Sequence, residues 1–184
     1  MLVAVFLGHD WFMVNPDVQH ADDQTFVDDI EGYPGSLSIV PGQDLALHVS
    51  TRAESWSVRI ERWGAERVVV YEEAGLAGEL HVPPADADAN GCGWPVALEV
   101  PVGQDWRSGF YLVTLTADGA DPSRAVAHAG FVVRGQGASM LYVVPTNTWN
   151  AYNTWGGKSL YTGHRGLVSS PGGTWHVVPA RAIR

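Results

Sequence analysis

The most restrictive feature of this sequence is a succession of short, alternating apolar runs between residues 30 and 135. In one of them Leu45, Leu47 and Val49 alternate with less apolar residues, which gives a strand with one apolar face. Such a face is buried only against a second sheet, and Pro, Gly and Asp clusters separate the runs as turns do. The predicted strands cover residues 36–40, 44–51, 55–63, 67–72, 96–101, 109–117 and 125–134.

These runs predict a mainly β fold, an immunoglobulin-like antiparallel β-sandwich over residues 30–135. About a hundred residues and seven strands match that architecture, although the single cysteine excludes its usual internal cystine. Residues 82–94, rich in Pro, Asp, Ala and Gly, are predicted to be a loop that crosses between the sheets. Residues 1–29 lack a clear period and are left as an unassigned lead-in.

After residue 137 the pattern changes. Residues 140–145, MLYVVP, form an uninterrupted apolar run, which predicts a strand buried on both faces in a parallel α/β sheet. A polar and aromatic segment follows at 146–161, and the carboxyl ends of such strands are where open α/β sheets bind ligands. The remaining residues offer one weak strand at most. We therefore expect 138–184 to be the incomplete start of an α/β catalytic domain.

The segment TNTWNAYNTWGGKSLY is the densest cluster of unusual residues. Asparagines and aromatic residues each recur every third position there, which at helical or 3₁₀ spacing places amides and rings on neighbouring faces. The segment either packs two domains together through its aromatic rings or lines a pocket. The residues concerned are Asn147, Trp149, Asn150, Tyr152, Asn153, Trp155 and Tyr161.

The charge distribution excludes some classes of function. The net charge is −9, which divides into −15 up to Asp121 and +6 after it, because no Asp or Glu follows that residue. An acidic body with scattered cations argues against nucleic-acid binding. The apolar start MLVAVFLG is too short to span a membrane and lacks the features of a signal peptide. We expect a soluble, cytoplasmic protein in which the lone Cys92 is a buried, inert thiol.

Common catalytic motifs are missing from the sequence. The GGKS at 156–159 resembles the end of a phosphate-binding loop, but Tyr152 stands where that loop needs glycine. No GxSxG occurs, no two histidines have metal-ligand spacing on one element, and the last glutamate is Glu99. Serine hydrolase, nucleotide-binding and two-carboxylate glycosidase sites therefore have no support, and no catalytic residue is assigned.

Four segments together carry a resemblance to a known family. EGYPGSLSIVPGQ, GCGWPVALEVP and WRSGFYLVTL precede the Asn-rich segment NTWNAYNTWGGKSLY. This combination resembles the C-terminal part of the large (β) subunit of N,N-dimethylformamidase, over about residues 30–161. The resemblance implies that the α/β part is glutamine-amidotransferase-like.

What the resemblance implies for function is an amidohydrolase that cleaves N-substituted formamides to formate and an amine at a mononuclear iron. Two tyrosines and a glutamate hold the iron in that family, and hard anionic oxygens suit ferric iron. The matching tyrosines are Tyr111 and Tyr152, with Tyr161 as the alternative to Tyr152. The glutamate has no counterpart, because no carboxylate follows Asp121. We therefore expect a fragment, or a subunit completed by a companion chain or by a homo-oligomer, acting on a small amide.

A different function remains open at this stage. The sandwich can be a non-enzymatic binding module whose Trp, Tyr and Asn surface stacks on carbohydrate or docks a protein partner. Iron bound through tyrosinate distinguishes the first hypothesis, and loss of binding on Trp149→Ala or Trp155→Ala distinguishes the second.

Overall fold

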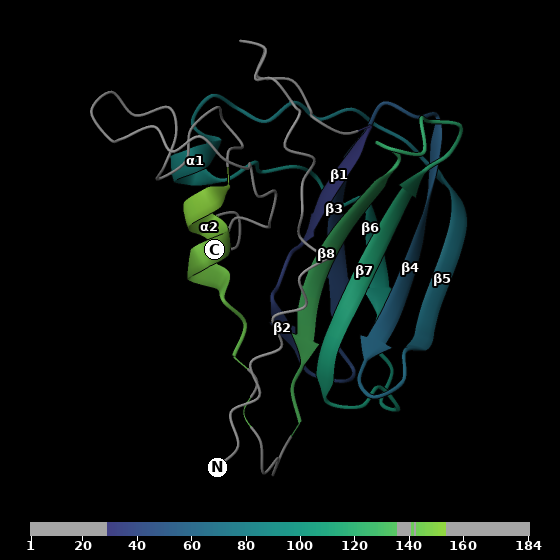
Figure 1. Cartoon of the computed structure of the whole chain (residues 1–184), viewed down its shortest axis with the longest axis vertical. Helices are drawn as coiled ribbons and strands as arrows, with labels where there is room; N and C mark the ends of the chain where they lie inside the picture. Colours follow the sequence, from purple (N-terminus) through teal and green to yellow (C-terminus); the bar gives the residue numbers. More distant parts are fainter. Residues whose placement is uncertain (1–28, 136–140, 142, 154–184) are drawn as a thin grey trace.

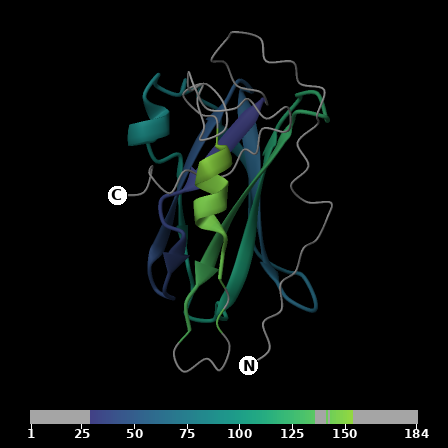
Figure 2. The same cartoon turned by 60° about the vertical axis from the view of Figure 1, so that its left-hand side comes forward.

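The computed structural model describes residues 29–135, 141 and 143–153, which form two packed β-sheets with little helix (Figures 1 and 2). The smaller sheet has the order β1-β3-β6 and contains β1 (Ile30–Pro34), β3 (Asp44–Thr51) and β6 (Leu98–Pro101). The larger has the order β2-β8-β7-β4-β5 and contains β2 (Ser38–Ile39), β4 (Ser55–Trp63), β5 (Val68–Ala77), β7 (Gly109–Ala117) and β8 (Val126–Val133). The prediction of a mainly β fold with two packed sheets is confirmed.

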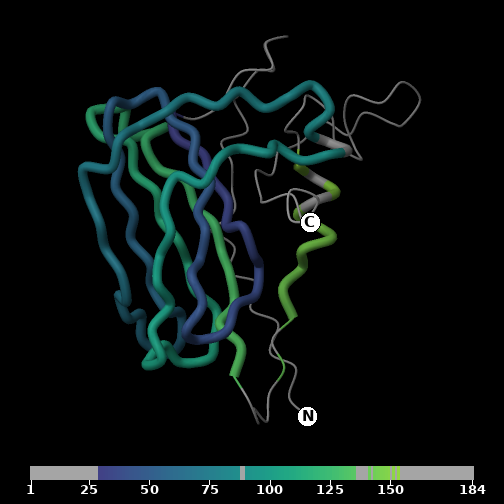
Figure 3. Tube along the Cα trace, turned by 180° about the vertical axis from the view of Figure 1, so that it is seen from behind, coloured from purple at the N-terminus to yellow at the C-terminus, as the bar shows by residue number. Residues whose placement is uncertain are grey.

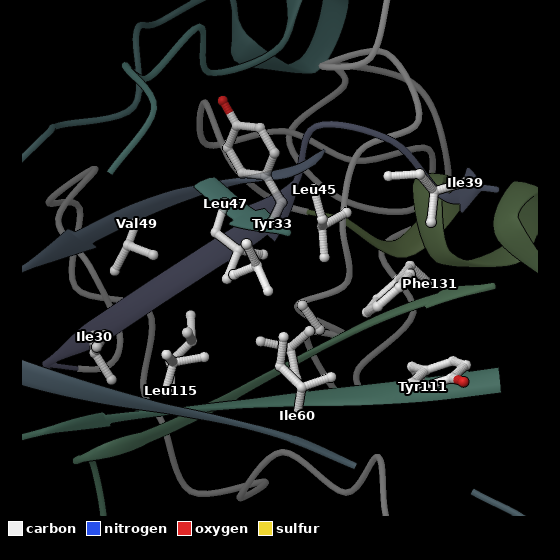
Figure 4. Packing of buried hydrophobic residues seen from close by; sticks show 14 of the residues in the cluster. Ile30, Tyr33, Ile39, Leu45, Leu47, Val49, Ile60, Tyr111, Leu115 and Phe131 are labelled. Carbon is white, nitrogen blue, oxygen red and sulfur yellow. The ribbon is translucent and has the colours of Figure 1, made fainter. Parts of the chain in front are cut away.

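The core lies between the two sheets and follows the predicted alternation. On β4, Trp56, Val58 and Ile60 are buried, and on β3 the inward positions are Leu45 and Leu47. Figure 4 shows Leu45, Leu47 and Ile60 meeting between the layers. The bounds predicted from alternation for β3, β4 and β7 are therefore confirmed.

Strand β1 is an element that the alternation did not predict. All five of its residues are buried, and it pairs antiparallel with β3 in a register that sets Gly32 opposite Val49. A Cβ atom on Gly32 would lie 2.8 Å from the backbone oxygen of His48 and 2.6 Å from Cδ1 of Leu115. The strand is thus held close to both its neighbour and the opposite sheet, which only glycine permits.

The connection between β5 and β6 crosses from the larger sheet to the smaller one, as predicted (Figure 3). It contains a single helical turn, α1 (Ala87–Asn90), that the sequence did not indicate. The strand before it is longer than predicted, because β5 continues past Glu72 to Ala77. Gly75, with φ of 72°, lies where the pairing with β4 shifts register, so this half of the strand breaks the simple alternation.

Helix α2 (Thr146–Tyr152) lies on the same flank of the sandwich as α1, beyond β1 and β2 (Figures 1 and 3). No helix in the described part of the chain is long and apolar enough to cross a membrane.

The predicted strand at 140–145 is wrong for the residues that are described. Residues 141 and 143–145 belong to no strand, and Leu141 and Val143 are 89% and 74% exposed. An apolar run is buried on both faces only where neighbouring strands flank it, and no described strand pairs with this segment.

Replacing Gly32 with alanine is expected to destabilise the sandwich by about 3 kcal/mol, because the methyl group meets backbone that cannot move without breaking the β1–β3 pairing. Chemical denaturation measures the change. Gly64→Ala is the matched control: its Cβ would lie 3.3 Å from the end of the flexible Arg62 side chain and 3.6 Å, an ordinary contact, from the backbone oxygen of Glu66, so we expect a change within about 0.5 kcal/mol. Equal losses for the two variants would contradict this account of β1.

Candidate functional site

Tyr111, one of the two predicted iron ligands, lies in the core between the sheets. Its position on β7 points inward, and its ring is fully buried (Figure 4). It stacks between Trp106, at a centroid distance of 5.2 Å, and Phe131, at 5.3 Å. The hydroxyl donates a hydrogen bond of 2.5 Å to the backbone oxygen of Arg107, four residues earlier.

These surroundings favour the neutral phenol of Tyr111. Burial raises its pKa above the ordinary value, and the nearby charge of Arg62 opposes that rise. An iron ligand needs the phenolate, which would have to lose both the proton and the bond to Arg107. The packing and the hydrogen bond by themselves explain why a tyrosine occupies this position. Its pairing with Tyr152 on one iron stays a prediction, because the Tyr152 side chain lies outside the described residues.

The Asn-rich segment is helical over α2, in agreement with its spacing. Asn147 is exposed, whereas Trp149 is half-buried and packs against the core cluster. Asn153 follows the helix in an extended conformation, is buried, and donates its backbone N–H to the oxygen of Trp149 at 3.0 Å. The packing of Trp149 supports the interpretation in which the aromatic rings fasten this segment to the sandwich.

The side chains of the other predicted pocket residues lie outside the described part of the chain. The side chain of Asn150, like that of Tyr152, lies outside the described residues, and so do Trp155 and Tyr161.

The outer face of the smaller sheet carries a buried polar and aromatic group that the sequence did not single out as a site. We call its five residues, Glu31, Tyr33, His48, Cys92 and Trp94, the Tyr33 cluster. Tyr33 and His48 are opposite each other on β1 and β3, and their rings stack at 4.7 Å. In Figure 4 the Tyr33 hydroxyl points away from Leu115 and Ile60, so it leaves the sheet on the side opposite the core.

The crossing loop closes over the Tyr33 cluster through Trp94, which forms two hydrogen bonds to it, and through Pro95, whose backbone oxygen also lies 3.1 Å from Nδ1 of His48. The backbone N–H of Trp94 donates to the Tyr33 hydroxyl at 3.1 Å, and Nδ1 of His48 donates to the Trp94 oxygen at 2.8 Å. Because a carbonyl only accepts, the second bond fixes the proton of His48 on Nδ1. Gly91 and Gly93, both with positive φ, flank Cys92 and let the loop turn the thiol and the Trp94 ring inward.

Burial favours the neutral forms of the Cys92 thiol and the Tyr33 phenol. It raises the pKa of the Cys92 thiol to about 12, and the Glu31 carboxylate acts in the same direction. Burial likewise raises the pKa of Tyr33 to about 12, partly offset by the hydrogen bond from Trp94. The cluster therefore lacks the activated thiolate that a nucleophilic cysteine requires, and the prediction of an inert Cys92 agrees with this geometry.

Comparison with models of known protein families shows to which family the chain belongs. The family described as N,N-dimethylformamidase beta subunit-like, C-terminal, matches residues 57–181, which is more than half of the chain. The chain belongs to this family. A search of curated proteins found no match. The match to the N,N-dimethylformamidase beta subunit-like family begins within β4 and extends past α2, so it includes both the larger part of the sandwich and the Asn-rich segment. The resemblance seen in the sequence motifs is thereby confirmed.

The described residues do not by themselves form a metal site of the usual composition. Within residues 29–135, 141 and 143–153, no three His, Cys, Asp or Glu side chains are grouped so that they could hold an ion.

The Tyr111 hydroxyl gives a direct test of its role in the core. Tyr111→Phe keeps the ring stack but removes the bond to Arg107, so we expect a loss of about 1 kcal/mol in the free energy of unfolding. Tyr71→Phe is the control, because that hydroxyl bonds only to the exposed Glu73 on the edge strand and is expected to matter less. If Tyr111→Phe has no effect on stability, the hydroxyl does not fasten the core.

The buried thiol makes a second prediction, for alkylation at pH 8. With a pKa of about 12 and little exposure, Cys92 is expected to react with iodoacetamide far more slowly in the folded chain than in guanidinium chloride. It is the only cysteine, so the alkylated mass by mass spectrometry reports on this site alone. Equal rates in the two states would show that the Tyr33 cluster does not enclose it.

Proposed function

We propose that this chain forms part of an amide hydrolase that cleaves N-substituted formamides to formate and an amine. The observation that supports the proposal is the family match over residues 57–181, which joins the sandwich to the Asn-rich segment in one unit. The substrate is a small amide, since the family takes its description from N,N-dimethylformamide cleavage.

The proposed cofactor is a mononuclear iron with Tyr152 as its principal ligand in this chain. When bound, such an iron polarises the amide carbonyl of the substrate. Trp149, three residues earlier on α2, packs against the core and so holds the helix that carries Tyr152 in place. Asn147 and Asn150 offer amide groups that both donate and accept hydrogen bonds, as recognition of an amide substrate requires.

Tyr111 enters this proposal as the second ligand, as the family resemblance implies, but its surroundings supply a competing explanation. A ligand role predicts that Tyr111→Phe lowers iron content without affecting the fold. A core role predicts lower stability with iron content unchanged.

A further ligand is proposed to come from another chain. No Asp or Glu follows Asp121 in the given sequence, so the family's glutamate ligand has no counterpart there, and the described residues contain no group of three or more His, Cys, Asp or Glu side chains that could hold an ion. A companion subunit or a second copy of this chain would then complete the site. Residues from 138 onward remain proposed to belong to a glutamine-amidotransferase-like α/β unit, and a cytoplasmic location stays a prediction.

We also propose that the sandwich has immunoglobulin-type connectivity. The strands β8, β7, β4 and β5 would then correspond to G, F, C and C′, and β1, β3 and β6 to A, B and E. A buried Trp56 on β4 and the Tyr111 hydroxyl bonded four residues upstream at the start of β7 support this assignment, because that fold places a core tryptophan on strand C and a tyrosine corner on strand F.

Iron analysis of the purified full chain, together with a hydrolysis assay on N,N-dimethylformamide, tests the proposed function. We expect bound iron, a visible tyrosinate charge-transfer band, and loss of both band and activity in Tyr152→Phe. Tyr71→Phe is the matched control and should retain both, because Tyr71 lies on β5 at the far edge of the larger sheet. A chain that binds no iron and releases no formate, alone or with its companion chain, would refute the proposal.

A further inference from the structure

The crossing loop contains a chemically labile pair that the proposed function does not use. Asn90-Gly91 is the only Asn-Gly dipeptide in the sequence. Glycine has no side chain to shield its backbone nitrogen, so this nitrogen can attack the side-chain carbonyl carbon of a preceding asparagine. The pair lies at the end of α1, directly before Cys92, which belongs to the Tyr33 cluster.

Two hydrogen bonds protect the pair while α1 is formed. The Gly91 backbone N–H donates to the oxygen of Ala87 at 2.9 Å, and Nδ2 of Asn90 donates to Oδ2 of Asp86 at 2.8 Å. The first bond occupies the nitrogen that would attack, and the second ties the Asn90 amide to Asp86.

This protection is weak, because α1 is a single turn. It has four residues, no side-chain hydrogen bond at its N-cap and no basic residue in its last turn. One helical turn is unstable without tertiary contacts, and among the α1 side chains that the structure describes, Ala87 belongs to the buried core cluster. Asn90 itself is exposed. Local opening of this turn therefore frees both the Gly91 nitrogen and the Asn90 side chain without unfolding the sheets.

We propose that Asn90 is a site of spontaneous deamidation whose product opens α1 over the Tyr33 cluster. The Gly91 nitrogen forms a bond to Cγ of Asn90, the Cγ–Nδ2 bond breaks, and the nitrogen leaves as ammonia with the proton from Gly91. Water then opens the cyclic imide at either carbonyl and gives aspartate or isoaspartate. No oxidant, metal or enzyme is needed.

The product differs from asparagine in the contact that holds the turn. A carboxylate at position 90 faces the Asp86 carboxylate four residues away, so a hydrogen bond becomes a like-charge repulsion. The isoaspartate form also lengthens the main chain just before Gly91, whose N–H closes the turn. Both changes favour the open form of α1, and Cys92 lies two residues further along the chain.

The site is tested by incubating the full folded chain at pH 8 for several days and mapping its peptides by mass spectrometry. We expect the mass gain of one dalton in the peptide that contains Asn90, with aspartate and isoaspartate separated by chromatography. Asn147 serves as an internal reference, since it is also exposed and helical but precedes threonine. If Asn90 reacts no faster than Asn147, the proposed modification site is refuted.

The opening of α1 is tested separately with variants. Asn90→Asp carries the charge of the product, whereas Asn90→Ser removes the bond to Asp86 without adding charge. We expect iodoacetamide to label Cys92 several-fold faster in Asn90→Asp than in the unmodified chain, with Asn90→Ser in between. Thermal melting checks that both variants fold. Equal labelling rates in folded Asn90→Asp and the unmodified chain would refute the opening.

Discussion

The register of β4 against β7 is the constraint on which the rest of the structure depends. Eight consecutive pairs, from Trp56 opposite Ala117 to Trp63 opposite Phe110, set the same alternation on both central strands. A slip of one residue would turn every inward side chain of one strand to the outer face of the sheet. The larger sheet thereby presents one apolar face. The smaller sheet packs against this face, and the crossing loop and α2 are attached to the resulting sandwich.

The crossing loop gives the smaller sheet a second buried layer on its outer side. Tyr33 and His48 face outward from the sandwich, yet the loop encloses them through Trp94, which also buries Cys92. β1 is consequently buried on both faces although it is an edge strand of its sheet. This arrangement keeps its backbone away from the pairing with other chains to which exposed edges are prone.

The sequence predicted those elements well that local patterns determine, and it failed where contacts between residues distant in the sequence determine the structure. Alternation is a local property, and it gave β3, β4 and β7 their bounds. β1 was missed because Gly32 and Pro34 interrupt its pattern, and its burial comes from β3 and the opposite sheet. The expected strand at 140–145 was wrong because an apolar run does not reveal whether neighbouring strands exist.

The candidate site was less predictable than the fold. The Tyr33 cluster joins residues that are 46 and 61 positions apart, so no local pattern could reveal it. The motif GCGWP, which carries part of the family resemblance, lies in the loop that covers the cluster. It did not indicate which residues this loop contacts. For Tyr111, the resemblance named a residue whose stacking partners, Trp106 and Phe131, only the folded core brings together.

The short link between β1 and β2 also has a mechanical consequence. β1 pairs with β3 in one sheet, and after a link of three residues β2 joins β8 of the other sheet in parallel, with Ser38 opposite Val132. Tension applied to the two ends of the sandwich would act along these parallel strands, so their hydrogen bonds would be loaded together in shear instead of opening one at a time. β2, the shortest of the described strands, would then be the element that resists stretching.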